Sequence, residues 1–198
     1  MATVVDAGST NQPGPGRNHL PGDKNMWVFV LGDLVIFGAY FLIFMVYRSR
    51  ERELFLESQQ HLSLTVGVAN TLVLLASSWF VATSVHASRG GQYRRAIGLT
   101  LLGGTCGVLF LAIKAYEWAT KITAGYTFPS SDFFMFYYML TGVHLFHIAL
   151  GLVFLGVVVI ELRNPAQRRV SMVETGATYW HMVDLLWIVI FALVYVAR

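Results

Sequence analysis

Seven polar side chains stand inside otherwise apolar blocks of this sequence, and they are the residues best suited to chemistry. They are Asp33, Lys114, Glu117, His144, His147, His181 and Asp184. Their side chains exchange protons, form ion pairs or ligate metals. If the blocks cross a bilayer, each charge near its centre costs roughly 2.5–3.5 kcal/mol on insertion scales, so these groups are expected to face a bundle interior, a cavity or a partner.

Asp33 is the first of these groups along the chain. It lies about seven residues, or roughly 10 Å, into the first apolar block. This depth is too great for so short a side chain to reach water, so Asp33 is expected to be protonated or paired. Two roles stay open: a carboxylate that handles protons or faces a partner, and an interhelical hydrogen bond that fixes packing.

Lys114 and Glu117 are three residues apart near the end of the third apolar block. This spacing places them on one face of a helix, where they are expected to pair. The long Lys114 side chain is expected to snorkel outward from the membrane. The main interpretation is a structural ion pair.

The histidines allow two interpretations. His144 and His147 project from one helix face, and His181 and Asp184 repeat the same spacing in the last block. Histidines on facing helices can ligate haem or another metal, although a di-iron bundle needs a Glu-x-x-His motif that this sequence lacks. The other interpretation is a set of cross-helix hydrogen bonds, each worth about 0.6–2 kcal/mol.

The composition places these residues in a membrane. Of the 198 residues, 56% are hydrophobic and 13% charged, about half the charged share usual for a soluble domain. Soluble enzymes and nucleic-acid-binding proteins are therefore excluded, and the net charge of +3 is attributed to membrane loops. The single cysteine, Cys106, excludes an intrachain disulfide and a CxxC motif.

The expected fold is all-α, a bundle of five transmembrane helices. The apolar blocks cover residues 26–47, 64–86, 96–118, 133–160 and 179–197. Even the shortest block reaches about 28 Å as a helix, close to the thickness of the hydrocarbon core. Residues 1–24 are expected to be a flexible polar tail and residues 25–198 one membrane domain. Gly103, Gly107 and Asn70 are expected to serve helix packing.

The loops predict the orientation. Eight Lys and Arg residues fall in the tail, the second loop and the fourth loop, and five fall on the opposite side. Because cytoplasmic loops carry the excess of positive charge, the N-terminus is expected in the cytoplasm and the C-terminus outside.

Five short motifs follow one another along these blocks. The first motif is M-W-V-F-V-L-G-D at residues 26–33, which ends in an acidic residue. The second consists of an N-T pair at 70–71 and an S-S pair at 77–78. The third is K-A-Y-E-W at 114–118. The fourth block carries G-x-H-x-x-H-x-x-x-G at 142–151, and the last carries Y-W-H-M-V-D-L-L-W at 179–187. In this order the chain resembles subunit III of the haem–copper terminal oxidases (cytochrome c oxidase) over residues 26–198.

Two departures point to one branch of that family. Asp33 stands where most members have Glu, and Lys114 where most have Gln. Together with the short five-span chain, these residues resemble most the NorE-like branch associated with nitric oxide reductase operons.

The resemblance implies a non-catalytic subunit of a respiratory haem–copper complex, stabilising the catalytic subunit and supporting proton uptake through a partner-facing Asp33. It implies no catalytic residue, metal or redox cofactor in this chain, with haem and copper in the partner, and a buried network of Lys114, Glu117, His144, His147, His181 and Asp184. Phospholipid is an expected ligand, although two helices of the family's lipid cleft are missing. The expected place is a bacterial plasma membrane, beside other oxidase or reductase subunits and lipid, without nucleic acid.

Two alternatives stay open. One is an accessory NorE-type protein of nitric oxide reductase. The other is a stand-alone membrane protein that binds haem through two histidines, or another metal. A transporter is disfavoured because five spans show no inverted repeat and no pair of Gly/Pro-broken helices.

Overall fold

The described chain is helical almost throughout. The computed structural model describes residues 24–165 and 168–197, and within these ranges no strand occurs. The elements are α1 (Lys24–Arg50), α2 (Arg52–Gln60), α3 (Leu64–Arg89), α4 (Tyr93–Thr123), α5 (Asp132–Arg163), α6 (Val170–Phe191) and the π-helical turn η1 (Ala192–Val196). Five of them are long and apolar enough to cross a membrane. The prediction of an all-α, five-span membrane protein is confirmed; residues 1–23 of the expected tail lie outside the described residues.

The helices extend beyond the apolar blocks. Helix α6 begins at Val170 rather than at residue 179, and α4 ends at Thr123 rather than near residue 118. Polar side chains continue these helices past the hydrophobic stretch, as Glu174 does in α6, where its Oε1 lies 2.8 Å from Arg89 Nη2 of α3. Hydropathy marks where a helix crosses the lipid, not where the helix ends.

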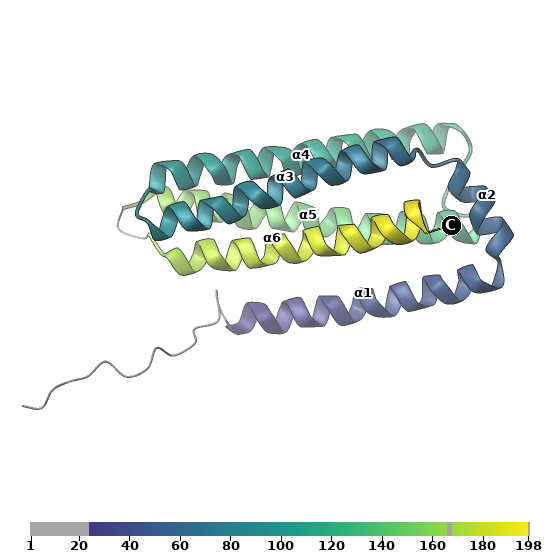
Figure 1. Ribbon diagram of the computed structural model, residues 1–198, viewed down its shortest axis with the longest axis horizontal. Coiled ribbons are helices and arrows are strands. Elements are labelled where there is room, and N and C mark those ends of the chain that lie inside the picture. Colours follow the sequence, from purple (N-terminus) through teal and green to yellow (C-terminus); the bar gives the residue numbers. More distant parts are fainter. Residues whose placement is uncertain (1–23, 166–167, 198) are drawn as a thin grey trace, which may run out of the picture.

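Helices α3, α4, α5 and α6 form the bundle, and α1 lies along one side of it (Figure 1). Buried residues on α1 are seven apart, at Val30, Phe37 and Phe44. In the most apolar 18-residue stretch of α1, only 17% of the residues are buried inside the protein, whereas 56% are buried in the corresponding stretch of the last span. Helix α1 is therefore peripheral, whereas α6 is central to the fold.

The short helix α2 crosses the end of the bundle between α1 and α3 (Figure 1), where the sequence predicted only a loop. Phe55 of α2 is buried and packs edge-on against Phe44 of α1 and Phe133 of α5, with ring centroids 5.5 and 5.6 Å apart. Helix α2 thus fastens the end of α1 to the bundle.

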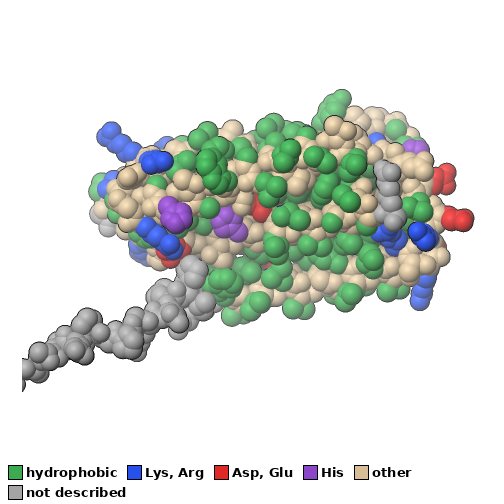
Figure 2. Space-filling model, in the orientation of Figure 1, with side chains coloured by type: hydrophobic (Ala, Val, Ile, Leu, Met, Phe, Trp, Pro, Cys, Tyr) green, Lys and Arg blue, Asp and Glu red, His purple; other side chains and the backbone are tan. Residues whose placement is uncertain are grey.

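Figure 2 shows hydrophobic side chains over the middle of the molecule, with Lys, Arg, Asp and Glu gathered mainly toward the two ends. This distribution matches a protein whose middle contacts lipid chains and whose ends contact water and headgroups.

Candidate functional site

Asp33 of α1 faces His147 of α5. Asp33 Oδ2 lies 3.3 Å from His147 Nε2, and the two side chains are 14% and 11% exposed. The atoms are at ion-pair distance but outside hydrogen-bond geometry, because Oδ2 has no hydrogen-bond partner among the described residues. The structure therefore brings together two groups that the sequence left apart.

The other nitrogen of His147 fixes the ring. His147 Nδ1 lies 2.8 Å from the backbone oxygen of Val143. A carbonyl oxygen only accepts hydrogen bonds, so Nδ1 carries a hydrogen and Nε2 is left to face Asp33. One further proton between Nε2 and Oδ2 gives either an imidazolium–carboxylate pair or a neutral imidazole beside a carboxylic acid.

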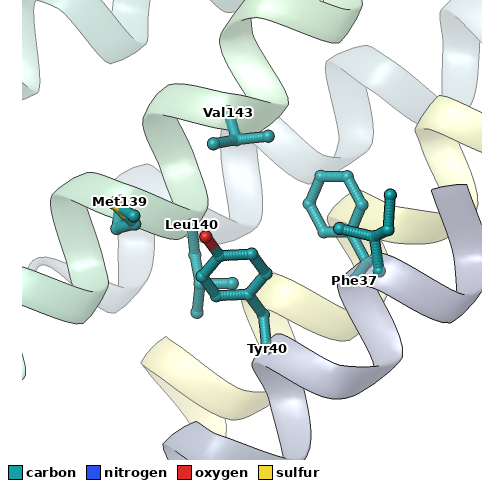
Figure 3. A pocket seen from close by; sticks show the side chains of 6 residues that line it. Phe37, Tyr40, Met139, Leu140 and Val143 are labelled. Atoms are coloured by element: carbon teal, nitrogen blue, oxygen red, sulfur yellow. The ribbon is translucent and has the colours of Figure 1, made fainter.

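Aromatic rings close around this pair. Phe37 packs edge-on against His147, with ring centroids 5.4 Å apart, and the hydroxyl of Tyr179 donates to the backbone oxygen of His147 at 3.3 Å. One helical turn away, Phe37 and Tyr40 face Leu140 and Val143 across a small hollow of about 20 Å³ between α1 and α5 (Figure 3). The seam beside Asp33 is therefore not fully packed.

Lys114 and Glu117 form a second buried polar group, together with Tyr195. Lys114 Nζ donates to Glu117 Oε2 at 3.1 Å and to the Tyr195 hydroxyl at 2.5 Å, and that hydroxyl donates to Glu117 Oε1 at 2.6 Å. The rings of Tyr137, Trp187 and Tyr195 lie 4.8, 5.2 and 4.9 Å from Nζ. Lys114 is fully buried, so the expectation that it snorkels outward is wrong: a carboxylate, a hydroxyl and three aromatic faces hold the ammonium inside.

Tyr195 was not predicted as a site residue, and its position depends on a local irregularity. Residues 192–196 form the π-helical turn η1, in which Ala197 N donates to Ala192 O at 2.8 Å. The side chain of Gln59 of α2 donates to the backbone oxygens of Val194 and Ala197 at 2.9 and 2.8 Å. These bonds satisfy carbonyls that a helix end leaves free, and the sequence carries no motif for them.

His144 lies deep in the bundle and is fully buried. It stacks on Trp187 with ring centroids 5.2 Å apart and meets the edge of Phe110 at 5.7 Å. Neither ring nitrogen has a hydrogen-bond partner among the described residues. His144 therefore packs as an aromatic ring, although it is only three residues from His147.

His181 and Asp184 lie at the seam between α6 and α3. His181 Nδ1 is 2.7 Å from the Ser78 hydroxyl of α3 and 3.9 Å from Asp184 Oδ2. Asp184 is 4% exposed, and its two oxygens have no hydrogen-bond partner among the described residues. Of the two residues, His181 therefore makes the contact between α6 and α3, with the hydroxyl of Ser78.

The small and amide residues lie where helices approach closely. A Cβ added to Gly103 would be 2.7 Å from Val81 of α3, and one added to Gly107 would be 2.6 Å from the Trp180 ring of α6. Asn70 of α3 is 1% exposed, and its amide atoms have no hydrogen-bond partner in the described chain.

Metal ligation is the remaining chemistry that the sequence suggested. Among the described residues, no group of three or more His, Cys, Asp and Glu side chains lies close enough to hold a metal ion. The neighbours of the three histidines in the spans are a carboxylate for His147, aromatic rings for His144 and a hydroxyl for His181. This geometry supplies an ion-pair contact for His147, aromatic packing for His144 and a helix–helix contact for His181.

Known proteins are similar to this chain over most of its length. The sequence profile of cytochrome c oxidase subunit III matches residues 24–197. A probable cytochrome c oxidase subunit 3 of Mycobacterium leprae is 32% identical, with 86% of this chain and 85% of the relative covered. Cytochrome c oxidase subunit 3 of Synechocystis sp. is 31% identical over 98% of this chain and 85% of its own length, and that of Bacillus sp. strain PS3 is 26% identical over 91% and 90%. The chain belongs to the cytochrome c oxidase subunit III family.

Proposed function

We propose that this chain is a non-catalytic, multi-pass subunit of a respiratory haem–copper oxidase in a bacterial plasma membrane. It lies beside the catalytic subunit, stabilises it and supports its proton uptake through Asp33 and His147. The proposal is supported by family membership and by bacterial relatives named cytochrome c oxidase subunit 3. The observation that carries the proton role is the 3.3 Å contact between Asp33 and His147.

The position of the pair suits exchange with a neighbouring protein. Asp33 lies on the peripheral helix α1, and both side chains keep 11–14% exposure. A lone charge at this depth costs roughly 2.5–3.5 kcal/mol, whereas an imidazolium beside a carboxylate, or a neutral imidazole beside a carboxylic acid, is neutral overall. When the Asp33–His147 pair gains or loses a proton, the pair becomes charged. We expect a polar group of the partner subunit to stabilise this charged form.

The haem and copper of the complex belong to the catalytic subunit in this proposal, and this chain binds no redox group. Oxygen is the proposed substrate of the complex, because the curated relatives are named as cytochrome c oxidase subunits. An accessory role in nitric oxide reductase, as in the NorE-like branch, would show as a partner that reduces nitric oxide and not oxygen.

The test is to purify the complex from native membranes through a tag on this chain. Asp33→Asn is compared with the wild type and with Glu57→Gln, which removes a carboxylate from an exposed position of α2. We expect Asp33→Asn to assemble with unchanged haem content but with lower turnover or a shorter active lifetime. Glu57→Gln should match the wild type.

Two results would count against the proposal. If turnover and active lifetime of Asp33→Asn are unchanged at all pH values, Asp33 has only a role in helix packing. A reduced-minus-oxidised spectrum in which haem stays on the separated chain would favour a histidine-ligated cytochrome instead.

A further inference from the structure

A surface groove follows α6, with α1 along one side and α3 along the other (Figure 1). Its floor is a stripe of α6 side chains that the described chain leaves wholly or partly exposed: Thr178, His181, Leu185, Ile188, Ala192 and Val196. These residues recur every three or four positions, so they lie on one helix face. The stripe is roughly 27 Å long, close to the thickness of the hydrocarbon core. The groove is therefore long enough to hold a membrane-spanning helix.

The wall formed by α1 stands apart from α6 in the half of the groove nearer α2. Gly38, Ala39 and Leu42 of α1 line a hollow of about 690 Å³ there, together with Val189 and Leu193 of α6. A Cβ added to Gly38 would meet no atom within 4 Å. Small residues allow the backbone of another helix to approach closely. This half of the groove therefore suits packing against an incoming helix.

The middle of the groove is polar. The His181 side chain is 39% exposed, and its Nδ1 lies 2.7 Å from the Ser78 hydroxyl and 3.9 Å from Asp184 Oδ2. His181 is roughly 16 Å from the start of α6, and Ser78 is roughly 16 Å from the end of α3. Figure 2 shows histidine and acidic side chains near the middle of this face, among hydrophobic ones. The imidazole therefore reaches the surface deep inside the membrane span.

This polar cluster is incomplete within the chain. The Ser78 hydroxyl has one acceptor within hydrogen-bond distance among the described residues, His181 Nδ1. A hydroxyl that donates to Nδ1 leaves the hydrogen of the neutral imidazole on Nε2. His181 meets described polar groups only through Nδ1, and both oxygens of the buried Asp184 lack a hydrogen-bond partner in the same part of the chain. His181 therefore presents an unsatisfied N–H donor to the groove.

The depth of this donor decides what can cover it. Acyl chains carry no hydrogen-bond acceptor, and the polar headgroups of lipids lie near the ends of the spans. A helix of another subunit can place an acceptor side chain at the depth of His181, where cross-helix hydrogen bonds stabilise association. Trp79 of α3, next to Ser78 in the sequence, is 64% exposed and is of the residue type that contributes most binding energy at protein interfaces. These features favour a helix over lipid.

We propose that the groove binds a transmembrane helix of a partner subunit, and that a carboxylate or carboxamide of this helix accepts a hydrogen bond from His181 Nε2. The proposal rests on the proposed function, because it requires a partner in the membrane, and it assigns that partner a docking surface. The surface is separate from the contact between Asp33 and His147, which joins α1 to α5. It adds a polar contact in the middle of the membrane that fixes the height of the partner helix against α6.

The first test identifies the occupant in the complex purified from native membranes through a tag on this chain. A photoreactive benzoylphenylalanine replaces Leu185, which is 51% exposed and lies one turn from His181. The control position is Ile160 of α5, which is 70% exposed and lies outside the groove. We expect position 185 to cross-link to one transmembrane segment of a partner subunit, with Asp, Glu, Asn or Gln within two turns of the cross-linked residue. Position 160 should give little of this product.

The second test measures how fast the partner dissociates from the immobilised chain in mild detergent. His181→Phe keeps an aromatic ring and removes the donor, so dissociation should be about fivefold faster, the equivalent of about 1 kcal/mol for one interhelical hydrogen bond. Ser78→Ala is the matched control, because it breaks the same contact inside the chain but leaves Nε2 able to donate. Its dissociation rate should stay near that of the wild type. Leu185→Trp should speed dissociation by obstructing the groove, whereas Ile160→Trp should not.

Three results would overturn the proposal. They are cross-links from position 185 only to lipid or to a second copy of this chain, a cross-linked helix without a polar side chain near the cross-link, and equal dissociation rates for His181→Phe and Ser78→Ala. If His181→Phe does not fold, an unchanged dissociation rate of Leu185→Trp decides against the groove. An intact, active complex without a cross-link from position 185 would overturn this proposal alone. A chain that purifies without any partner would overturn the proposed function as well.

Discussion

His147 Nε2 lies 3.3 Å from Asp33 Oδ2 across the seam between α5 and the peripheral helix α1. The bond from His147 Nδ1 to Val143 O holds the ring in the orientation that faces Asp33. Each group is the other's partner at a depth where an unpaired charge is costly. The pair is therefore a polar tie between α1 and the bundle.

A double-mutant cycle on this pair should show coupling. Asp33→Asn and His147→Gln are each expected to lower the free energy of unfolding of the isolated chain by about 1–2 kcal/mol, because each leaves a polar group without its partner. The double variant should lose less than the sum, with a coupling energy of about 0.5–1.5 kcal/mol. Unfolding in mixed detergent and SDS micelles measures all four proteins, and strictly additive losses would contradict the pairing.

Lys114 and Glu117 should behave as a buried ion pair whose halves depend on each other. Lys114→Met leaves the Glu117 carboxylate buried without its cation and is expected to cost about 3–5 kcal/mol. Adding Glu117→Gln removes the stranded charge and should restore most of that loss. Tyr195→Phe, which removes only the bridging hydroxyl, should cost about 1–2 kcal/mol. The same unfolding assay applies, and a double variant weaker than Lys114→Met would argue against an ion pair.

Local spacing predicted part of this site. The five spans follow from hydropathy, and the pairing of Lys114 with Glu117 follows from the i, i+3 spacing on one helix face. Both are properties of a short stretch of chain. They need no knowledge of how the helices stand against one another.

The rest of the site depends on relations between distant segments. Asp33 meets His147 and not His144 because of the relative height and rotation of α1 and α5, which no single-helix pattern contains. Tyr195 reaches Lys114 from 81 residues away, at a π-helical turn that the apolar sequence does not signal. The burial of Lys114 was missed because snorkelling assumes nearby lipid or water, whereas three rings converge on its ammonium.

His181 should contribute to stability through Ser78. His181→Leu removes the 2.7 Å contact with the Ser78 hydroxyl and is expected to lower stability by about 0.6–2 kcal/mol. Ser78→Ala should have a similar effect, and the two together little more than either alone. A thermal scan of the purified chain in detergent measures the three variants. Equal melting temperatures for His181→Leu and the wild type would show that the contact between His181 and Ser78 does not stabilise the protein.

The glycines of α4 offer a sharp test of the packing between α4 and α6. A methyl group at Gly107 would lie 2.6 Å from Trp180 Cη2. The Trp180 ring is fully buried, and its Nε1 donates to Ser77 at 3.0 Å, so the ring cannot shift without losing that bond. Gly107→Ala is therefore expected to lower the free energy of unfolding by about 1–3 kcal/mol through overpacking.

Gly98, on the same helix, provides the control. A methyl group added there meets no atom within 4 Å, and Gly98→Ala should stabilise the protein by up to about 1 kcal/mol through helix propensity. Opposite shifts of the melting temperature in one detergent would separate packing from propensity, and a stabilised Gly107→Ala would contradict the close approach of α4 to Trp180.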